Sequence, residues 1–255
     1  MIELADVPGG KSIYFASDFH LGIPTYKDSR EREKIIIRWL DQVSPTAHAI
    51  FLVGDLFDFW FEYKHVVPKG YIRFLGKLAE LRDKGIPIYI FTGNHDMWMF
   101  QYLPQELDIP VIRENITLTL NGTSFLIGHG DGLGPGDGFY KIIKRVFRNK
   151  ICQRVFAFLH PYIGMGIANF WSKSSRNNHG DKDKAFQHEK EFLFQYCIDQ
   201  EKKAHHDYYI FGHRHKPLTM EVNKDSTYIN LGEWMNDYTY AVFDGRVCEL
   251  KQFIS

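Results

Sequence analysis

The sequence predicts an α/β fold in which two mixed sheets pack together and are flanked by helices. In the first half, short apolar strand patterns alternate with amphipathic helical segments, as in βαβ units. In the second half, Asn-Gly and Asp-Gly dipeptides beside strand patterns indicate hairpins. The chain has 255 residues and 44% hydrophobic content, which is enough for one large domain or a core with a subdomain.

The expected elements follow in chain order. Amphipathic helices are predicted over residues 28–42 and 70–84, and Gly85 is expected to end the second as a C-cap. Two-residue hairpins are expected at Asn121-Gly122 and Asp244-Gly245, and a later helix around residues 185–203. Apolar, β-branched or aromatic runs predict strands at residues 13–16, 50–53, 86–91, 125–127 and 208–211.

A polar block follows each of these predicted strands. The blocks are Asp18-Phe19-His20, Gly54-Asp55, Gly93-Asn94-His95-Asp96, Gly128-His129-Gly130-Asp131 and Gly212-His213-Arg214-His215. Open α/β sheets place their sites where strands end. Carboxylate, imidazole and amide oxygen ligands suit divalent ions, and a set without thiolates argues against a structural zinc cage. The blocks therefore predict a two-metal site.

The predicted ligands divide between two ions. We assign Asp18, His20 and His215 to one ion, and Asn94, His129 and His213 to the other. Asp55 is the expected bridge between ions that lie ~3.5–4 Å apart in such centres. Mn²⁺ is the predicted ion, with Fe²⁺, Zn²⁺ and Mg²⁺ as alternatives.

Such a site predicts hydrolysis of a phosphate ester by in-line attack of a metal-activated water on phosphorus. No protein base is then required, so His95 is free to stabilise the equatorial oxygens or to protonate the leaving oxygen. Asn94 is expected beside it at the reacting phosphate. Asp58 and Asp96 are candidate partners that orient the ligand or catalytic imidazoles.

The five blocks resemble, in order, the D-x-H, G-D, G-N-H-D, H-G-D and G-H-x-H blocks of the calcineurin-like metallophosphoesterase superfamily. That resemblance implies a four-layer α/β/β/α sandwich. Within the superfamily, residues 54–60 (GDLFDFW) and Leu231-Gly232-Glu233-Trp234 resemble blocks of the UDP-2,3-diacylglucosamine hydrolases of lipid A synthesis, and the similarity covers nearly the whole chain. One departure is His95, because the best-known branch has arginine at that position.

The closer resemblance implies cleavage of UDP-2,3-diacylglucosamine into UMP and 2,3-diacylglucosamine 1-phosphate. It also implies a substrate-binding set: Asn94, His95, Asp137, Tyr140, Ser172 and His213. Two alternatives stay open. His95 in place of arginine favours a metallophosphoesterase acting on soluble nucleotides or phosphodiesters. The second alternative is a non-catalytic interaction module on the same fold, although such proteins usually lack some of the metal-ligand residues, which are all present here.

Residues 136–180 are a predicted insertion into a core formed by residues 1–135 and 181–255. The insertion carries eight Lys or Arg against one acid, and its apolar residues recur at helical spacing. We expect a helical lid whose apolar lining accepts acyl chains and whose cationic rim meets phosphates or an anionic membrane surface. An ordinary helical hairpin with a solvated basic face is the alternative. The apolar stretch 155–171 is interrupted and too short for a membrane span.

Bulk properties agree with a cytoplasmic enzyme. Net charge is zero, so no global field draws the chain toward nucleic acid. Three cysteines without a C-x-x-C pair indicate reduced, mostly buried thiols. The first 12 residues lack the basic and apolar regions of a signal peptide. We expect a cytoplasmic protein, peripherally associated with the inner membrane, and the oligomeric state stays open.

Overall fold

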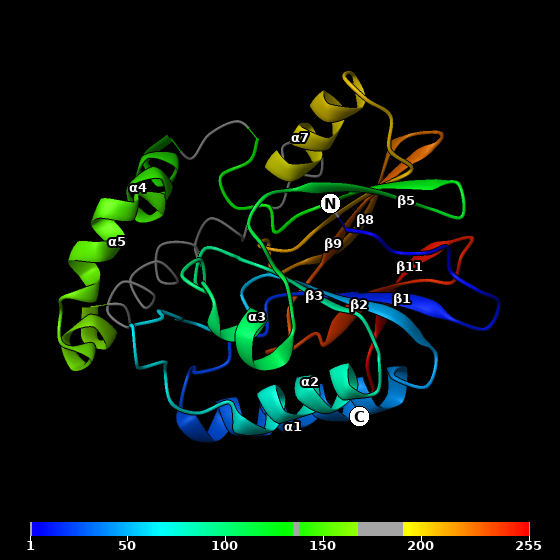
Figure 1. Ribbon diagram of the computed structural model, residues 1–255. Coiled ribbons are helices and arrows are strands. Elements are labelled where there is room, and N and C mark those ends of the chain that lie inside the picture. The colour runs from blue at the N-terminus through cyan, green and yellow to red at the C-terminus, as the bar shows by residue number, and fades with distance from the viewer. Residues whose placement is uncertain (1, 135–137, 168–190, 255) are drawn as a thin grey trace.

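Two mixed sheets pack face to face, with helices on both outer faces (Figure 1). This computed structural model describes residues 2–134, 138–167 and 191–254. The strand orders are β11-β10-β1-β2-β3-β4 and β5-β6-β7-β9-β8. The predicted architecture of two mixed sheets flanked by helices is confirmed.

The first sheet contains the parallel strands that the early βαβ pattern predicted. Strands β1 to β4 are parallel neighbours, and β10 pairs antiparallel with both β1 and β11. Helix α1 (Tyr26–Val43) connects β1 to β2, α2 (Ile72–Asp83) connects β2 to β3, and α3 (Tyr102–Leu107) precedes β4. The strands are β1 (Ser12–Ala16), β2 (Ala47–Val53), β3 (Ile88–Phe91), β4 (Val111–Ile112), β10 (Thr239–Phe243) and β11 (Cys248–Gln252).

The second sheet has a parallel centre and antiparallel edges. Strand β7 lies between β6 and β9 in parallel, while β5 and β8 are antiparallel to their neighbours. Helix α7 (Phe192–Glu201) packs on its outer face through Leu193 and Cys197. The strands are β5 (Ile116–Leu120), β6 (Thr123–Ile127), β7 (Tyr208–Phe211), β8 (Pro217–Asn223) and β9 (Ser226–Leu231).

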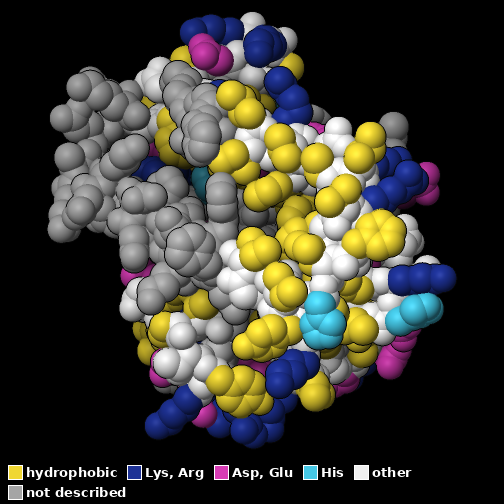
Figure 2. Space-filling model, turned by 90° about the vertical axis from the view of Figure 1, so that its left-hand side faces the viewer, with side chains coloured by type: hydrophobic (Ala, Val, Ile, Leu, Met, Phe, Trp, Pro, Cys, Tyr) yellow, Lys and Arg dark blue, Asp and Glu magenta, His cyan; other side chains and the backbone are white. Residues whose placement is uncertain are grey.

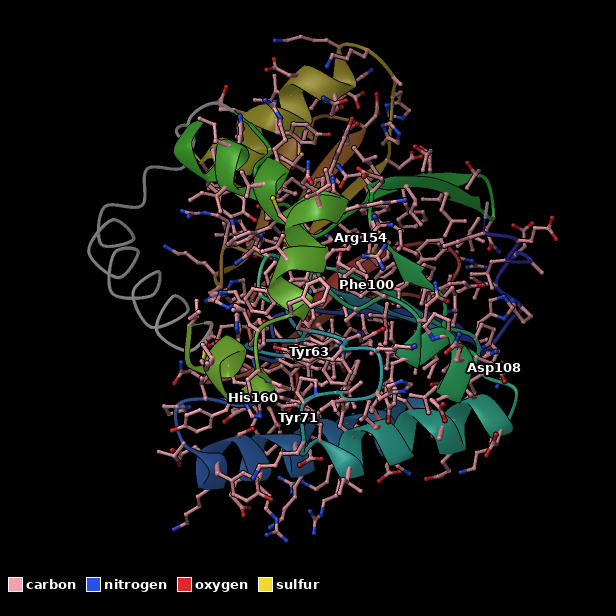
Figure 3. The ribbon with its side chains drawn as sticks, turned by 60° about the vertical axis from the view of Figure 1, so that its left-hand side comes forward. Tyr63, Tyr71, Phe100, Asp108, Arg154 and His160 are labelled. Atoms are coloured by element: carbon pink, nitrogen blue, oxygen red, sulfur yellow. The ribbon has the colours of Figure 1, made fainter. Side chains whose placement is uncertain are left out.

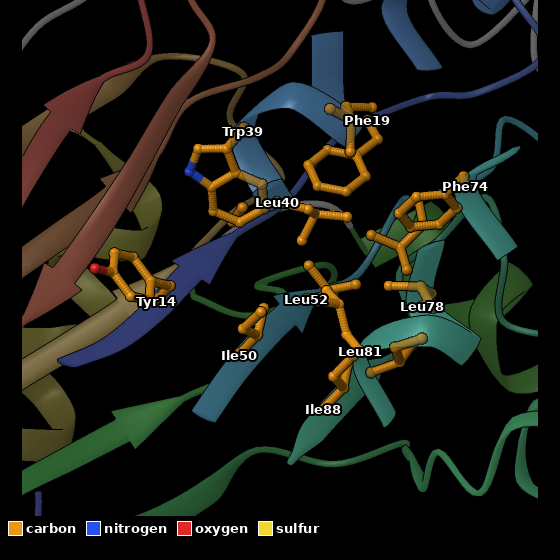
Figure 4. Packing of buried hydrophobic residues seen from close by; sticks show 14 of the residues in the cluster. Tyr14, Phe19, Trp39, Leu40, Ile50, Leu52, Phe74, Leu78, Leu81 and Ile88 are labelled. Atoms are coloured by element: carbon orange, nitrogen blue, oxygen red, sulfur yellow. The ribbon is translucent and has the colours of Figure 1, made fainter. Parts of the chain in front are cut away.

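The first sheet is buried on both faces because side chains alternate along each strand. In β1, Ile13 and Phe15 point toward the second sheet, whereas Tyr14 and Ala16 point toward α1 and α2. Figure 4 shows the layer beneath the helices, where Trp39 and Leu40 of α1 meet the strands. Such two-sided burial explains why these strands are continuously apolar in sequence.

Local signals fix where the two crossover helices begin and end. Helix α1 begins earlier than predicted because the Thr25 hydroxyl accepts a hydrogen bond from the Asp28 N–H, at 3.2 Å, and caps it. Gly85 ends α2 as predicted, with φ +81°. Its N–H donates to the Arg82 carbonyl, and the next N–H, of Ile86, donates to the Leu81 carbonyl, which is the Schellman pattern.

Both predicted hairpins form, but only one has the predicted loop. Asn121 and Gly122 both have positive φ, and Leu120 pairs with Thr123, so this is the expected two-residue turn. The second prediction was wrong in length, because Phe243 pairs with Cys248 and four residues form the loop. The Asp244 carboxylate accepts hydrogen bonds from the N–H groups of Arg246 and Val247 and stabilises the longer turn.

The described part of the predicted insertion contains three helical segments. They are α4 (Gly138–Arg148), α5 (Lys150–Ala157) and residues 161–167. Helices α4 and α5 extend along one side of the sandwich in Figure 1. Of the cysteines, Cys197 and Cys248 are buried, whereas Cys152 on α5 is exposed. The boundaries at 135/136 and 180/181 stay a prediction, and the expected helix at 185–203 is described only from residue 191 onward.

Candidate metal centre

The predicted ligands meet at one edge of the sandwich, where strands from both sheets end. Asp18 follows β1, Asp55 follows β2 and Asn94 follows β3, and these three strands are parallel. His129 follows β6, while His213 and His215 follow β7 in the second sheet. The carboxyl ends of five strands thus bring together side chains that are almost 200 residues apart in sequence.

A first group contains Asp18, His20, Asp55 and His215, whose ligand atoms all lie within 4.8 Å of one another. The Nε2 atoms of His20 and His215 are 2.9 Å apart. His215 Nε2 is 3.1 Å from Asp18 Oδ1, and His20 Nε2 is 3.8 Å from Asp55 Oδ2. Four potential metal-ligand side chains therefore converge on one small volume.

A second group contains Asp55, His129 and His213, again within 4.8 Å. His129 Nε2 is 3.3 Å from Asp55 Oδ2. The amide oxygen of Asn94 lies 3.2 Å from His129 Nε2 and 2.8 Å from His213 Nδ1. Asp55 belongs to both groups, which is the position that a bridging ligand occupies.

Each of the two buried carboxylates has one oxygen fixed by the protein and one left over. Asp18 Oδ2 accepts hydrogen bonds from the His213 N–H and the Ser17 hydroxyl, and Asp55 Oδ1 accepts from the His95 N–H. Asp18 Oδ1 and Asp55 Oδ2 are buried without a hydrogen-bond donor among the described residues. A buried anionic oxygen needs a cation, so this donor set fits divalent metal ions.

The imidazoles respond to these carboxylates. Burial lowers the pKa of His20, but the carboxylates of Asp18 and Asp58, 3.7 and 3.6 Å from its ring nitrogens, outweigh burial and raise this pKa to about 10. At His129 the charge of Asp55 likewise outweighs burial and raises the pKa to about 10. His213 differs, since burial and the neighbouring His129 lower its pKa to about 3. Metal binding must therefore displace protons from His20 and His129.

His95 lies beside the first group and is held by Asp58. The Oδ1 atom of Asp58 is 3.6 Å from the Nδ1 atoms of both His20 and His95, and its carbonyl oxygen is 3.0 Å from His95 Nδ1. Burial lowers the pKa of His95. The predicted role of Asp58 as a partner of imidazoles thus has contacts to support it.

Asp96 contacts backbone rather than imidazoles. Its Oδ1 accepts a hydrogen bond from the Gly93 N–H at 2.7 Å, and its Oδ2 accepts one from the Leu56 N–H at 2.8 Å. Burial and the charge of Asp55 raise its pKa to about 7. Any supporting role of Asp96 is therefore exercised through the two loops that carry Asp55 and His95.

Five of the seven predicted ligands have left-handed backbone. Positive φ occurs at Asp18, His20, Asp55, His213 and His215, with values from 44° to 68°. Non-glycine residues adopt this region at a cost of ~1–3 kcal/mol each, and such strain clusters at functional sites. Hydrogen bonds between the loops offset the cost, including Asp18 N–H to the Gly54 carbonyl and His20 N–H to the Asp55 carbonyl.

The glycines of the blocks give the ligands room. A Cβ at Gly93 would collide with the carboxylate and backbone of Asp55. A Cβ at Gly212 would collide with Asp18 and Ser17. The glycines beside the predicted ligands therefore have a steric reason in this chain, because side chains from one loop lie directly on the backbone of another.

The predicted substrate residues are only partly described. Tyr140 on α4 lies near the centre, where its hydroxyl donates to Asp131 at 2.7 Å. Lys144, one turn further, pairs with the same carboxylate at 2.6 Å. Asp137 and Ser172 lie outside the described residues. Asp131, the last residue of the H-G-D block, thereby connects the metal centre to α4.

Sequence reasoning missed two other contacts that position ligands. Glu191, the N-cap of α7, lies 2.9 Å from the guanidinium of Arg214, which stands between His213 and His215. Arg32 on α1 donates to the carbonyl of His20 at 2.7 Å. No local pattern indicates either contact. The only sequence signal for Arg32 was its helical spacing from Ile36 and Trp39, which places it on the buried face of α1.

Comparison with known proteins decides the family. The model of the calcineurin-like phosphoesterase family matches residues 11–217. The chain belongs to this family. A UDP-2,3-diacylglucosamine hydrolase of Porphyromonas gingivalis is 38% identical to this phosphoesterase, over 94% of this chain and 96% of that protein. One from Proteus mirabilis is 27% identical, over 94% of this chain and 98% of that protein. The predicted family resemblance is confirmed.

The fold comparison gives weaker matches. Yfce, a phosphoesterase from E. coli of solved structure, is 16% identical with a TM-score of 0.45, covering 93% of this chain and 90% of that one. Within the described part of this phosphoesterase, no helix has both the length and the apolarity to cross a membrane.

Proposed function

We propose that this phosphoesterase hydrolyses the pyrophosphate bond of UDP-2,3-diacylglucosamine and releases UMP and 2,3-diacylglucosamine 1-phosphate. Curated relatives that align over nearly the whole chain carry the name of that activity. The observation that carries the proposal is the convergence of two donor groups that share Asp55, beside helices with an exposed apolar face. The two groups of metal-ligand side chains suit the pyrophosphate of the substrate, and the apolar face of the helices suits its acyl chains.

In this proposal two divalent ions, Mn²⁺ by preference, occupy the two groups. Asp18, His20 and His215 would hold one ion, while Asn94, His129 and His213 would hold the other. Asp55 would serve both, because its Oδ2 lies within 3.8 Å of a nitrogen in each group. Such ions polarise phosphoryl oxygens and lower the pKa of bound water to ~7. A protein base is then unnecessary.

In this proposal His95 is neutral before substrate binds and becomes protonated when substrate is bound. A carbonyl oxygen only accepts hydrogen bonds, so the contact with the Asp58 carbonyl places the proton of neutral His95 on Nδ1. Its Nε2 then carries a lone pair. Burial lowers the pKa of His95, whereas an incoming phosphate anion favours the imidazolium. His95 can therefore take up a proton as the substrate binds and donate from Nε2 to a phosphoryl or leaving oxygen.

The helices of the insertion present an apolar surface to solvent. Side chains at least 46% exposed include Val146 on α4 and Ile151, Val155 and Phe158 on or just after α5. Figure 2 shows this side of the molecule, where hydrophobic side chains gather across the face. Exposed patches of this kind mark lipid or partner contacts. We assign the face to acyl-chain binding and to peripheral contact with the cytoplasmic surface of the inner membrane.

The opposite face of the same helices holds them against the core. Phe147 and Phe156 pack with Phe61 and Trp98, and the Trp98 indole donates to the Phe147 carbonyl at 2.8 Å. Figure 3 shows α5, which carries Arg154, crossing the core near Phe100. Residues 136–180 thus act as a lid on a core formed by residues 1–135 and 181–255, in our proposal.

The test is hydrolysis by the purified, Mn²⁺-loaded protein, with products identified by mass. UDP-2,3-diacylglucosamine, UDP-glucose and a generic phosphodiester are compared at equal concentrations. The proposal expects UMP from the acylated substrate and little turnover of the other two. Efficient cleavage of the diester with the acylated substrate untouched would place the chain in another branch of the phosphoesterases, as His95 in place of arginine allows.

A further inference from the structure

A polar cavity of about 300 Å³ opens beside His129, away from the apolar face of the lid. Four parts of the fold line it: Thr92 at the end of β3, Asn115 before β5, Lys144 on α4 and Tyr196 on α7. Its volume is at the lower end of the range for small-molecule sites, ~300–1,000 Å³. The cavity therefore touches the metal centre through a predicted ligand, yet has a lining of its own.

A second, more open cavity of about 530 Å³ continues the first. The two share Thr92, Arg113 and Glu114, and the second reaches Lys150 and Gln153 of α5. A ligand anchored at the metal centre thus has a continuous path between the core and the lid, which is polar near His129 and meets Met97 and Phe100 further out. Of these two cavities, only the first is lined by His129, so we call it the His129 cavity.

The charges of the His129 cavity balance. Lys144 pairs with Asp131 at 2.6 Å, and Glu114 pairs with Arg148 at 3.0 Å. The guanidinium of Arg113 donates to the carbonyl of Met97 at 3.1 Å. Apart from the predicted metal ligand His129, two basic and two acidic side chains line the space, so these four offer no excess positive charge to a second phosphate. A neutral ligand with several hydrogen-bonding groups suits it better.

Asn115 is the best-placed recognition group in this cavity. Its Nδ2 donates to the Tyr196 hydroxyl at 3.2 Å, which leaves one N–H of the amide for a ligand. Gly128 has no Cβ, and a Cβ there would collide with the Asn115 side chain, so the amide lies against the backbone of the H-G-D block. The amide oxygen faces Gly128, so the remaining N–H is the group that can donate to one of the two carbonyl acceptors on the edge of uracil.

The proposed substrate has two arms that diverge from its pyrophosphate. One arm carries acyl chains and matches the exposed apolar side chains of α4 and α5. The other is a pyrimidine nucleoside, which is neutral, polar and compact. The His129 cavity is a polar, charge-balanced space next to the centre where the pyrophosphate would be held.

We propose that the His129 cavity is the nucleoside subsite, which receives the uracil and ribose of the substrate and of the product UMP. Asn115 reads the uracil edge, and Thr92 contributes its hydroxyl from the end of β3. Tyr196 fixes the Asn115 amide and is a positioning residue. This inference rests on the proposed function, because the sugar-nucleotide substrate comes from there.

The test compares binding of UMP and of inorganic phosphate to the Mn²⁺-loaded protein by calorimetry. Both ligands place a phosphate at the metal centre, so the ratio of their Kd values gives the contribution of the nucleoside to affinity. We expect UMP to bind at least tenfold more tightly than phosphate. The variants Asn115→Ala and Thr92→Val should each weaken UMP severalfold, and together about tenfold, while phosphate affinity stays unchanged.

Matched substitutions outside the cavity control for general effects on the fold. Thr219→Val makes the same change as Thr92→Val on β8, where Thr219 is exposed, and Gln105→Ala removes an exposed side-chain amide on α3. These two should keep the wild-type preference for UMP. Ribose 5-phosphate is the third ligand. It should bind little more tightly than inorganic phosphate if the base makes the decisive contacts.

The outcomes separate this inference from the proposed function. Equal affinity of the wild-type protein for UMP and phosphate, or an unchanged ratio in the double variant, would overturn the subsite even if the acylated substrate is hydrolysed. A UMP preference that depends on Asn115 and Thr92 would support the subsite. If the protein then failed to hydrolyse the acylated substrate, only the lipid part of the proposed function would be overturned.

Discussion

Asp55 has two separate tasks in the metal centre. Its Oδ1 accepts a hydrogen bond from the His95 N–H, and its Oδ2 faces both groups of donors. Asp55→Ala should therefore remove both ions together, from about two per chain to well below one, because each ion loses its shared anionic ligand. Metal content by mass spectrometry measures this. The exposed Asp225→Ala is the control, and a fully occupied Asp55→Ala would refute the bridging role.

His95 should behave differently from the ligands. Its Nδ1 contacts the Asp58 carbonyl, and in our assignment it holds neither ion. His95→Ala should lower kcat about 100-fold or more, the usual range for a positioned proton donor, with metal content unchanged. His48→Ala, at the opposite end of β2, should leave both quantities as in the wild type. Loss of the ions from His95→Ala would show that this residue is structural instead.

At the scale of residues, the sequence predicts which side chains meet but not how the backbone allows it. Asp18 and His215 meet because strand ends converge, and that follows from the strand patterns. The left-handed backbone of both residues does not follow, since it depends on hydrogen bonds between loops. The Glu191–Arg214 pair was equally beyond prediction, because its partners come from separate elements with no shared pattern.

At the scale of elements, α7 is joined to the second sheet by a network around Glu201. The Glu201 carboxylate accepts hydrogen bonds from the Tyr209 hydroxyl and the His206 N–H, and it contacts His205 and Asn223. Burial raises the pKa of Glu201, but these hydrogen bonds outweigh it and lower the pKa to about 2. The network stabilises the folded state only while Glu201 is ionised.

The pH dependence of stability follows from that lowered pKa. The contribution of Glu201 is fully present above its unfolded pKa of about 4.5 and is lost as the pH falls through about 2. Glu201→Gln should lower the free energy of unfolding by about 1–3 kcal/mol at neutral pH. The difference from wild type should shrink as the pH falls from 4.5 toward 2, in urea titrations. The exposed Glu221→Gln on β8 should show neither effect.

Element boundaries were predictable where the chain carries its own stop or start signal. Gly85 ends α2, and Asn121-Gly122 forms the predicted tight turn, since both depend on residues adjacent in sequence. The turn after β10 was predicted too short, because the Asp244 carboxylate captures two N–H groups that only the longer loop brings into reach.

At the scale of the whole molecule, the sandwich was predictable because apolar periodicity reports which faces are buried. The continuous apolar runs of β1, β2 and β3 require cover on both sides, which the second sheet and the α1–α2 layer provide. The His129 cavity could not be predicted, since it exists only where β3, α4 and α7 come together.

The outer face of the lid gives the last prediction. Ile151 and Phe158 are 69% and 91% exposed, and basic residues such as Arg145 and Arg154 lie on the same two helices. Apolar side chains that enter the bilayer interface gain free energy in proportion to the area they bury, and nearby cations are attracted to anionic lipids. Ile151→Ser with Phe158→Ser should therefore weaken binding to anionic phosphatidylglycerol vesicles at least tenfold in sedimentation assays.

The control variant removes exposed apolar side chains elsewhere on the surface. It tests whether vesicle binding depends on the position of these side chains or only on the exposed apolar area. Val247 and Ile254 are 50% and 86% exposed near β11, away from the lid. Val247→Ser with Ile254→Ser should keep vesicle binding, and added salt should weaken binding of the wild type because it screens the basic side chains. Equal losses in both double variants would mean that the vesicles adsorb the protein nonspecifically. The two proposed roles of these helices, membrane contact and acyl-chain binding, can also be separated. If the lid variant hydrolyses the acylated substrate at the wild-type rate, its exposed apolar side chains serve membrane contact and not acyl-chain binding.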